Sequence, residues 1–213
     1  ASIRSSVEQL ARASRGNEDE RFLAQLVLRE SDRLSRILSE FLDFSRVRVT
    51  RHRPVDLGAV AQAAVDTVRA HPDCSTGAEV TVSRSPASIE GDEDLLHRVI
   101  QNLVLNAVQA AGATARVNVE ARPATLAELP RGVRLDAPVL LRVSDNGPGI
   151  PDELRERLFH PFVTGRTGGT GLGLAIVQRA VQAHRGLVFV ESEKGRGTTF
   201  TVVFPAKAAE AAA

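Results

Sequence analysis

The segment GRTGGTGLGLAIV, Gly165–Val177, places five glycines within nine residues and then continues as an apolar helical pattern. A helix that follows such a run offers unpaired backbone N–H groups and a partial positive charge at its N-terminus. Because glycine lets the backbone come close, this arrangement suits phosphate groups, and Arg166 could add a cation. The run could equally be a flexible turn, since it is neither a Walker A loop nor a well-placed dinucleotide fingerprint.

A second segment, DNGPGI at Asp145–Ile150, directly follows the strand-like stretch VLLRVS. A carboxylate at a strand end beside a tight turn can accept a hydrogen bond from the exocyclic amine of an adenine. The alternative is an ordinary turn, because Asp-Asn-Gly is strong turn chemistry.

A third segment, HRVIQNLVLNAVQA at His97–Ala110, carries Asn102 and Asn106 four residues apart and therefore on one helical face. That face borders the apolar stripe, where polar amides need partners. Mg²⁺ and phosphate oxygens would supply them, since Mg²⁺ prefers oxygen ligands. Two capped or solvated amides remain the alternative.

The pattern of the remaining chain predicts an α+β fold, with helices layered on one face of a mixed sheet. The segments do not alternate strictly between helix and strand. Helices are expected at Leu57–Arg69, Asp92–Ala111 and Thr170–Ala183, strands at Glu79–Ser83, Arg116–Arg122, Val139–Ser144, Leu187–Glu191 and Thr199–Phe204, and a hairpin loop at Pro123–Pro138.

The first part of the chain predicts two helices with wide apolar stripes, one over Ile3–Ser14 and one over Phe22–Val47. Such a hairpin cannot bury both stripes alone, so a dimeric four-helix bundle would complete it; packing of the hairpin on its own domain is the alternative. We expect residues 1–47 to form the hairpin and residues 48–56 a linker ending at an N-cap, Asp56. Residues 57–205 would then form the second domain, and 206–213 a tail.

Composition bounds the function classes. The chain has 213 residues, a formal net charge of +1 and one cysteine, Cys74. The charge gives no strong attraction to nucleic acid or an acidic membrane, and one cysteine excludes an intramolecular disulfide framework and favours a reducing, cytoplasmic setting. No apolar run approaches the roughly 20 residues of a membrane helix. Because the chain opens without Met, we expect it to be a piece of a longer protein.

Together the three segments resemble, in order and separation, the N box and the two glycine boxes of sensor histidine kinases of two-component systems. LFHPF, Leu158–Phe162, resembles the F box between them, and GRGTTFTVVFP, Gly195–Pro205, the usual closing strand. ASIRSSVEQL and RESDRLSRILSEFLDFSRV resemble the dimerisation domain, and the NAVQA ending with a short lid is most similar to nitrogen-regulation-type sensors. The resemblance implies the GHKL, or Bergerat, ATPase fold for the second domain.

The resemblance also implies a site for ATP and Mg²⁺. Asp145 would bind the adenine amine, with Thr199 or its neighbour nearby through water. Asn106 would coordinate Mg²⁺ and Asn102 would support the phosphates. Pro151–Gly169 would form a lid with Phe159 and Phe162 anchoring its stem, and Gln109 stands where many relatives carry a basic residue. The other expected nucleotide-binding residues are Gly147, Gly149, Ile150, Arg166, Gly169, Thr170, Gly171, Leu172 and Gly173.

The implied function is transfer of the ATP γ-phosphoryl group to a histidine for relay to a response-regulator receiver domain, by a homodimer without nucleic-acid or membrane contact. The family's acceptor motif, His-Glu-x-Arg-Asn-Pro-Leu, contains none of the five histidines here, so we expect no autophosphorylation. Related ATPases carry a water-activating glutamate on the N-box helix where this chain has Asn102, which favours kinase over hydrolase. A GHKL-type ATPase and a catalytically silent nucleotide-binding module remain alternatives. Sensor modules lie upstream in this family, so the parent protein could be membrane-anchored.

Overall fold

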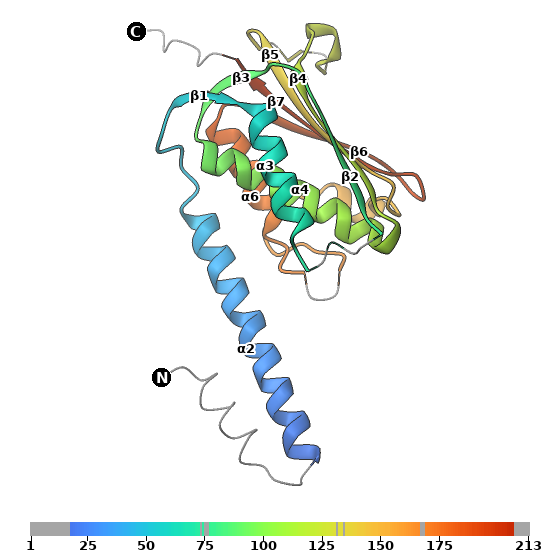
Figure 1. Ribbon diagram of the computed structural model, residues 1–213. Helices are drawn as coiled ribbons and strands as arrows, with labels where there is room; N and C mark the ends of the chain where they lie inside the picture. Colours follow the sequence, from blue (N-terminus) through green and yellow to red (C-terminus); the bar gives the residue numbers. More distant parts are fainter. Residues whose placement is uncertain are drawn as a thin grey trace.

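The computed structural model describes residues 18–206, apart from residues 73, 75, 76, 131, 134, 167 and 168. Figure 1 shows a long helix, α2 (Glu18–Ser45), running away from a body in which helices cover one face of a sheet. The helix expected at Ile3–Ser14, Gly168 of the glycine-rich segment and the end of the tail, 207–213, lie outside the described residues.

The main sheet has five strands in the order β2-β4-β5-β7-β6. The pair β2 and β4 is parallel and the other three pairs are antiparallel, so the sheet is mixed, as expected. The β5–β7 register sets Asp145 opposite Thr198. The strands are β2 (Glu79–Arg84), β4 (Arg116–Pro123), β5 (Pro138–Asp145), β6 (Leu187–Glu193) and β7 (Gly197–Pro205).

Three helices cover one face of this sheet: α3 (Leu57–Arg69), α4 (Glu93–Ala111) and α6 (Gly173–Ala183) (Figure 1). Their apolar sides and the facing strand residues form one continuous core, in which Leu103 and Leu141 are fully buried. The expected N-cap of α3 is confirmed, since the carboxylate of Asp56 accepts hydrogen bonds from two backbone N–H groups of the first turn. The α+β fold with helices on one face is therefore confirmed.

The structure adds elements that the sequence pattern did not predict. Strand β1 (Arg53–Asp56) lies inside the segment expected to be a linker and pairs antiparallel with β3 (Ser88–Gly91). Helix α6 begins three residues later than Thr170, because Gly171 has a φ of +70° that a helix cannot continue through. The short elements are one helix, α5 (Asp152–Arg155), and two 3₁₀ helices, η1 (Gly112–Thr114) and η2 (Leu126–Glu128).

Helix α2 is anchored to the body near its C-terminal end. Asp43 forms an ion pair with Arg98 of α4, and the guanidinium of Arg179 on α6 lies 4.9 Å from the ring centroid of Phe44. Val47, just beyond the helix, is buried in the core. Within the described residues, no helix combines the length and apolar composition needed to cross a membrane. The large apolar side chains of α2 left exposed are Phe22, Leu23, Val27, Leu34, Leu38, Phe41 and Leu42.

Candidate functional site

A cavity of about 400 Å³ lies between α4, the end of β5, the loop before α6 and the facing side of α2. Its volume falls in the range of about 300–1,000 Å³ typical of small-molecule pockets. Asp145, Asn106 and Gly171, from three separate segments, all line it. The predicted site residues that line the cavity are Asn102, Asn106, Gln109, Asp145, Gly149, Ile150, Arg166, Gly169, Thr170, Gly171 and Gly173.

Asp145 places a carboxylate at one end of the cavity. Its Oδ1 accepts hydrogen bonds from the backbone N–H groups of Gly147, at 2.8 Å, and Thr198, at 3.2 Å. Within the part of the chain that the structure describes, no hydrogen bond reaches its other oxygen, Oδ2. Burial raises the pKa of Asp145, and the two N–H donors offset only part of that effect. The result is a fixed acceptor with one oxygen available to a ligand.

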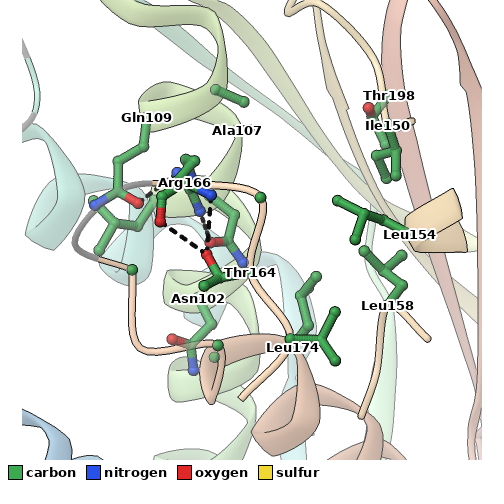
Figure 2. A pocket seen from close by; sticks show the side chains of 18 of the residues that line it. Asn102, Ala107, Gln109, Ile150, Leu154, Leu158, Thr164, Arg166, Leu174 and Thr198 are labelled. Atoms are coloured by element: carbon green, nitrogen blue, oxygen red, sulfur yellow. Dashed lines mark hydrogen bonds between the residues drawn. The ribbon is translucent and has the colours of Figure 1, made fainter. Parts of the chain in front are cut away.

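The cavity has an apolar end and a polar end. Figure 2 shows Ile150 and Leu154 on one side, and Arg166, Gln109 and Asn102 on the other. Ser192 Oγ bonds both the N–H of Ile150, at 2.8 Å, and Thr198 Oγ1, at 3.0 Å. Because the N–H of Thr198 also bonds Asp145, the carboxylate belongs to the apolar end. The cavity can therefore hold a flat apolar group with one hydrogen-bond donor at one end and charged groups at the other.

At the polar end, Arg166 bridges two amide side chains of α4. Its Nη2 donates to Oδ1 of Asn106 at 2.6 Å, and its Nη1 donates to Oε1 of Gln109 at 2.7 Å (Figure 2). Both oxygens thus already meet a positive charge. Asn102 lies beside the start of α6, where a Cβ on Gly173 would come within 3.3 Å of its Oδ1.

The side-chain oxygens at this end of the cavity suit a magnesium ion that is also bound by phosphate and water, rather than a metal ion held by protein side chains alone. Among the described residues, no group of three or more His, Cys, Asp or Glu side chains could hold a metal. Mg²⁺ is commonly bound by one or two protein oxygens together with phosphate oxygens and water. Asn106 Oδ1, which accepts from a guanidinium here, is the protein oxygen suited to that role.

The backbone entering α6 is held close to the preceding loop. Gly171 accepts a hydrogen bond from Phe162 N at 2.9 Å, and a Cβ on Gly171 would lie 2.5 Å from the carbonyl carbon of Phe162. Only glycine fits this approach and this φ. Thr170 Oγ1 accepts from Leu172 N at 3.3 Å and donates to the carboxylate of Glu40 on α2.

Four predicted residues do not line the cavity. Gly147 acts through its N–H on Asp145, and Leu172 is fully buried with its N–H already bonded to Thr170. Phe162, which we expected to anchor the lid stem, is 57% exposed and stacks on Phe41 of α2 instead. Thr199 donates to Ser144 Oγ on the opposite face of the sheet, so its neighbour Thr198 takes the place beside Asp145.

Sequence reasoning missed several residues that line the cavity. Thr164 Oγ1 accepts a hydrogen bond from the backbone N–H of Arg166. Its position inside the expected lid could have indicated that it lines the site. Arg36 and Glu40 come from α2, and nothing in their local pattern indicates that they face a cavity lined mainly by later segments of the chain. The other lining residues that we had not named individually for the site are His71, Leu105, Ala107, Ala110, Pro151, Leu154, Leu158, Val163, Gly165, Leu174 and Phe200.

Comparison with known proteins gives consistent matches. The family described as histidine kinase-, DNA gyrase B- and HSP90-like ATPase matches residues 91–208. Sensor histidine kinase ZraS of Escherichia coli O157:H7 is 34% identical over 207 residues, which cover 94% of this chain and 43% of ZraS. Sensory histidine kinase/phosphatase NtrB of Rhodobacter capsulatus is 34% identical over 190 residues, covering 86% of this chain and 52% of NtrB.

A solved structure supports the same likeness. Full-length ShkA in complex with AMPPNP superposes with a TM-score of 0.68 at 28% identity, covering 98% of this chain and 45% of ShkA. The chain spans about half the length, or less, of the curated relatives that it matches.

Proposed function

The chain belongs to the family of histidine kinase-, DNA gyrase B- and HSP90-like ATPases, and we propose that it acts as the ATP-binding kinase core of a sensor histidine kinase. One observation carries the proposal. Asp145, Asn106 and Gly171 line a single cavity that has an apolar end at the carboxylate and a polar end at the amides.

At the apolar end, the free oxygen of Asp145 would accept a hydrogen bond from the adenine amine. Its other oxygen is held by two backbone donors, so the carboxylate is fixed before the ligand arrives. The apolar side chains of Ile150, Leu154 and Leu158 would pack on the purine faces. An acceptor in this position favours adenine over guanine, whose equivalent ring position carries a carbonyl oxygen.

At the polar end, the triphosphate would lie between α4 and the N-terminus of α6. Glycine residues there allow close approach, and the helix end attracts anions. Asn106 Oδ1 would hold Mg²⁺, which when bound neutralises phosphate charge. Arg166, which bonds Asn106 and Gln109, lies where it can turn to a phosphate oxygen.

Phosphoryl transfer needs mainly positioning and charge neutralisation, so this cavity needs no catalytic base of its own. The nucleophile would be an unprotonated imidazole nitrogen in line with the γ-phosphorus, with ADP leaving as the new N–P bond forms. Asn102 is an amide that cannot take a proton from water. Its presence beside Gly173 therefore favours a kinase over a hydrolase.

None of the five histidines lies in an acceptor motif, and we propose that the acceptor is supplied separately from these 213 residues. His184 is buried in the core and His97 faces Thr67 of α3. We further propose that the exposed apolar side of α2 forms a homodimer, that a response-regulator receiver domain is the downstream partner, and that the unit works in the cytoplasm.

Turnover measurements test the proposal. Radiolabelled ATP is incubated with the chain alone and with an isolated acceptor domain that carries the phosphoacceptor histidine. A kinase labels the supplied domain, and Asp145→Ala abolishes that labelling. Rapid phosphate release without an acceptor would instead indicate an ATPase, and nucleotide binding with neither outcome a silent module. A phosphohistidine on the chain itself would contradict the proposed separate acceptor.

A further inference from the structure

Helix α2 contributes two charged side chains to the nucleotide cavity. Arg36 and Glu40 lie one turn apart on the same face of the helix, and both line the cavity. The carboxylate of Glu40 accepts a hydrogen bond from Thr170 Oγ1. That oxygen also accepts from the N–H of Leu172, so one hydroxyl links α2 to the backbone that enters α6.

The Glu40 carboxylate lines the cavity and bonds Thr170 just before α6, the end at which we place the phosphates of a bound nucleotide. The N-terminus of α6 attracts one negative charge, and two anions held together in a partly buried site repel each other. Glu40 and a γ-phosphate therefore compete for Thr170 and the adjacent helix end. Arg36, one turn away, would be attracted by the same phosphate.

We propose that Glu40 makes this cavity distinguish ATP from ADP. Its carboxylate holds Thr170 when no γ-phosphate is present, and a bound γ-phosphate takes its place. ADP, which lacks that phosphate, leaves the contact between Glu40 and Thr170 intact. The inference rests on the proposed function only in requiring that the cavity bind nucleotide.

A second contact links α2 to the same loop. The rings of Phe41 and Phe162 stack with centroids 6.5 Å apart and an interplanar angle of 20°. Phe162 has a φ of +66°, which is costly for a non-glycine residue and is held by its hydrogen bond to Gly171. Loss of the Glu40 bond therefore removes a contact that, together with this stack, holds the strained loop against α2.

The other anchors of α2 do not involve this loop. Asp43 pairs with α4 through Arg98, and Phe44 packs under Arg179 of α6. These contacts keep the end of α2 in place when Glu40 leaves. Binding of ATP rather than ADP would thereby release the contacts of α2 at Glu40 and Phe41, while the contacts at Asp43 and Phe44, about one turn later, stay in place.

Binding of two nucleotides to a matched pair of variants tests the proposal. Affinities for ADP and for a non-hydrolysable β,γ-imido ATP analogue are measured by calorimetry with Mg²⁺ at low salt. Glu40→Gln keeps the side-chain size and an oxygen that can accept from Thr170. Glu30→Gln is the control, because Glu30 is exposed on the same helix and forms an ion pair with Arg33, three residues along the chain, at 3.4 Å.

Glu40→Gln should bind the triphosphate roughly five- to tenfold more tightly and ADP within about twofold of the unsubstituted protein, because like charges in a partly buried site repel strongly. Glu30→Gln should change neither affinity. Equal tightening for both nucleotides, or no change for either, overturns the role of Glu40. If the unsubstituted protein binds neither nucleotide, the proposed function fails instead.

Fluorescence gives an independent reading of the loop contact. The chain contains no tryptophan or tyrosine, so Phe41→Trp introduces a single indole beside Phe162. The triphosphate analogue should shift its emission to longer wavelength as the stack opens, whereas ADP should leave the emission unchanged. Identical spectra with the two nucleotides would contradict a γ-phosphate-dependent release.

Discussion

Nη2 of Arg166 lies 2.6 Å from Oδ1 of Asn106, the oxygen that we expect to meet a metal ion. The guanidinium and Mg²⁺ would both be drawn to this oxygen, so they compete for it. We therefore expect Arg166 to leave Asn106 when a nucleotide binds with Mg²⁺. Its guanidinium would then donate to a phosphate oxygen of the nucleotide.

The first prediction concerns metal dependence. Asn106→Ala should remove most of the gain in ATP affinity that Mg²⁺ provides. The affinity measured with Mg²⁺ should fall roughly tenfold or more, which corresponds to about 1.4 kcal/mol. Affinity in EDTA should change by much less, because the adenine end is untouched. The measurement compares ATP binding with Mg²⁺ and with EDTA, and Asn118→Ala, on the exposed face of β4, is the control. An unchanged Mg²⁺ effect in Asn106→Ala would show that the metal is held elsewhere.

The second prediction separates binding from folding at Asp145. In Asp145→Asn the amide oxygen can still accept from Gly147 and Thr198, but its NH₂ group would face the adenine amine donor-to-donor. ATP affinity should fall at least tenfold. The melting temperature without nucleotide should be equal or higher, since burial disfavours the charged carboxylate that is removed. A large loss of stability would mean that the carboxylate serves the fold rather than the ligand.

The third prediction concerns the pH dependence of binding. Because the pKa of Asp145 is raised, its carboxylate takes up a proton at higher pH than an ordinary aspartate, whose pKa is about 3.9. The protonated group loses its acceptor oxygen, so ATP affinity should be flat near neutral pH and decline as the solution is acidified toward that raised pKa. Titrations from pH 7.5 downward test this, with circular dichroism at each pH to verify that the chain is folded. A constant affinity down to about pH 3.9, the ordinary aspartate pKa, in the folded chain would contradict the assignment.

Local signals in the sequence were sufficient for the main elements, whereas the residues of the cavity were assigned from the joint resemblance of three segments to one family. The apolar period and the capping carboxylate of Asp56 located α3 at both ends, because both signals act within one turn. The position of Asp145 at a strand end followed from the turn residues after it. Asn102 and Asn106 were correctly placed on one face because helix geometry fixes residues four apart.

What the sequence could not supply depends on tertiary packing. Strands β1 and β3 have four residues each and become strands only by pairing with one another, with Arg53 opposite Gly91 and Asp56 opposite Ser88, which are far apart in the sequence. Both Thr198 and Thr199 fit a strand, so composition could not tell which of the two faces the cavity. Glu40 looks like an ordinary solvent-facing residue of a helix until α2 is packed against the loop at Thr170.

The fourth prediction concerns the tight approach at Gly171. Gly171→Ala must adopt a φ of +70° and also place a Cβ 2.5 Å from the carbonyl carbon of Phe162. The first effect costs about 1 kcal/mol, and the second forces the loop to move. Gly195→Ala is a matched control, since Gly195 has a φ of +79° but nothing within 4 Å of the added Cβ. Gly171→Ala should lower ATP affinity and Gly195→Ala should not, as calorimetry can measure; equal affinities in both variants would show that the loop geometry is not needed for binding.

The fifth prediction concerns the stability of the fold in acid, at a buried junction between His184 and Asp92. His184 Nε2 accepts from the N–H of Asp92 at 2.9 Å, and Nδ1 donates to the carbonyl of Ala180 at 2.7 Å, which requires a neutral ring. Burial lowers the pKa of His184, although the Ala180 carbonyl and the Asp92 charge oppose that shift. For Asp92, burial alone would raise the pKa, but hydrogen bonds from Thr50 and other backbone groups lower it overall.

Both shifts predict that acid destabilises the fold, in two separate windows. The imidazole of the unfolded chain takes up a proton near pH 6.5, above the lowered pKa of the folded state, so the free energy of unfolding should fall as pH drops below that value. The Asp92 contribution is present above an unfolded pKa of about 3.9 and is lost as pH falls through its lower folded value.

His184→Gln cannot titrate, so the difference in unfolding free energy between pH 7.5 and 5.5 should shrink in denaturant titrations, even though the variant is less stable at both pH values. His160→Gln, at an exposed position, should keep the full difference. If the two variants behave alike, the acid sensitivity must come from groups other than the His184–Asp92 junction.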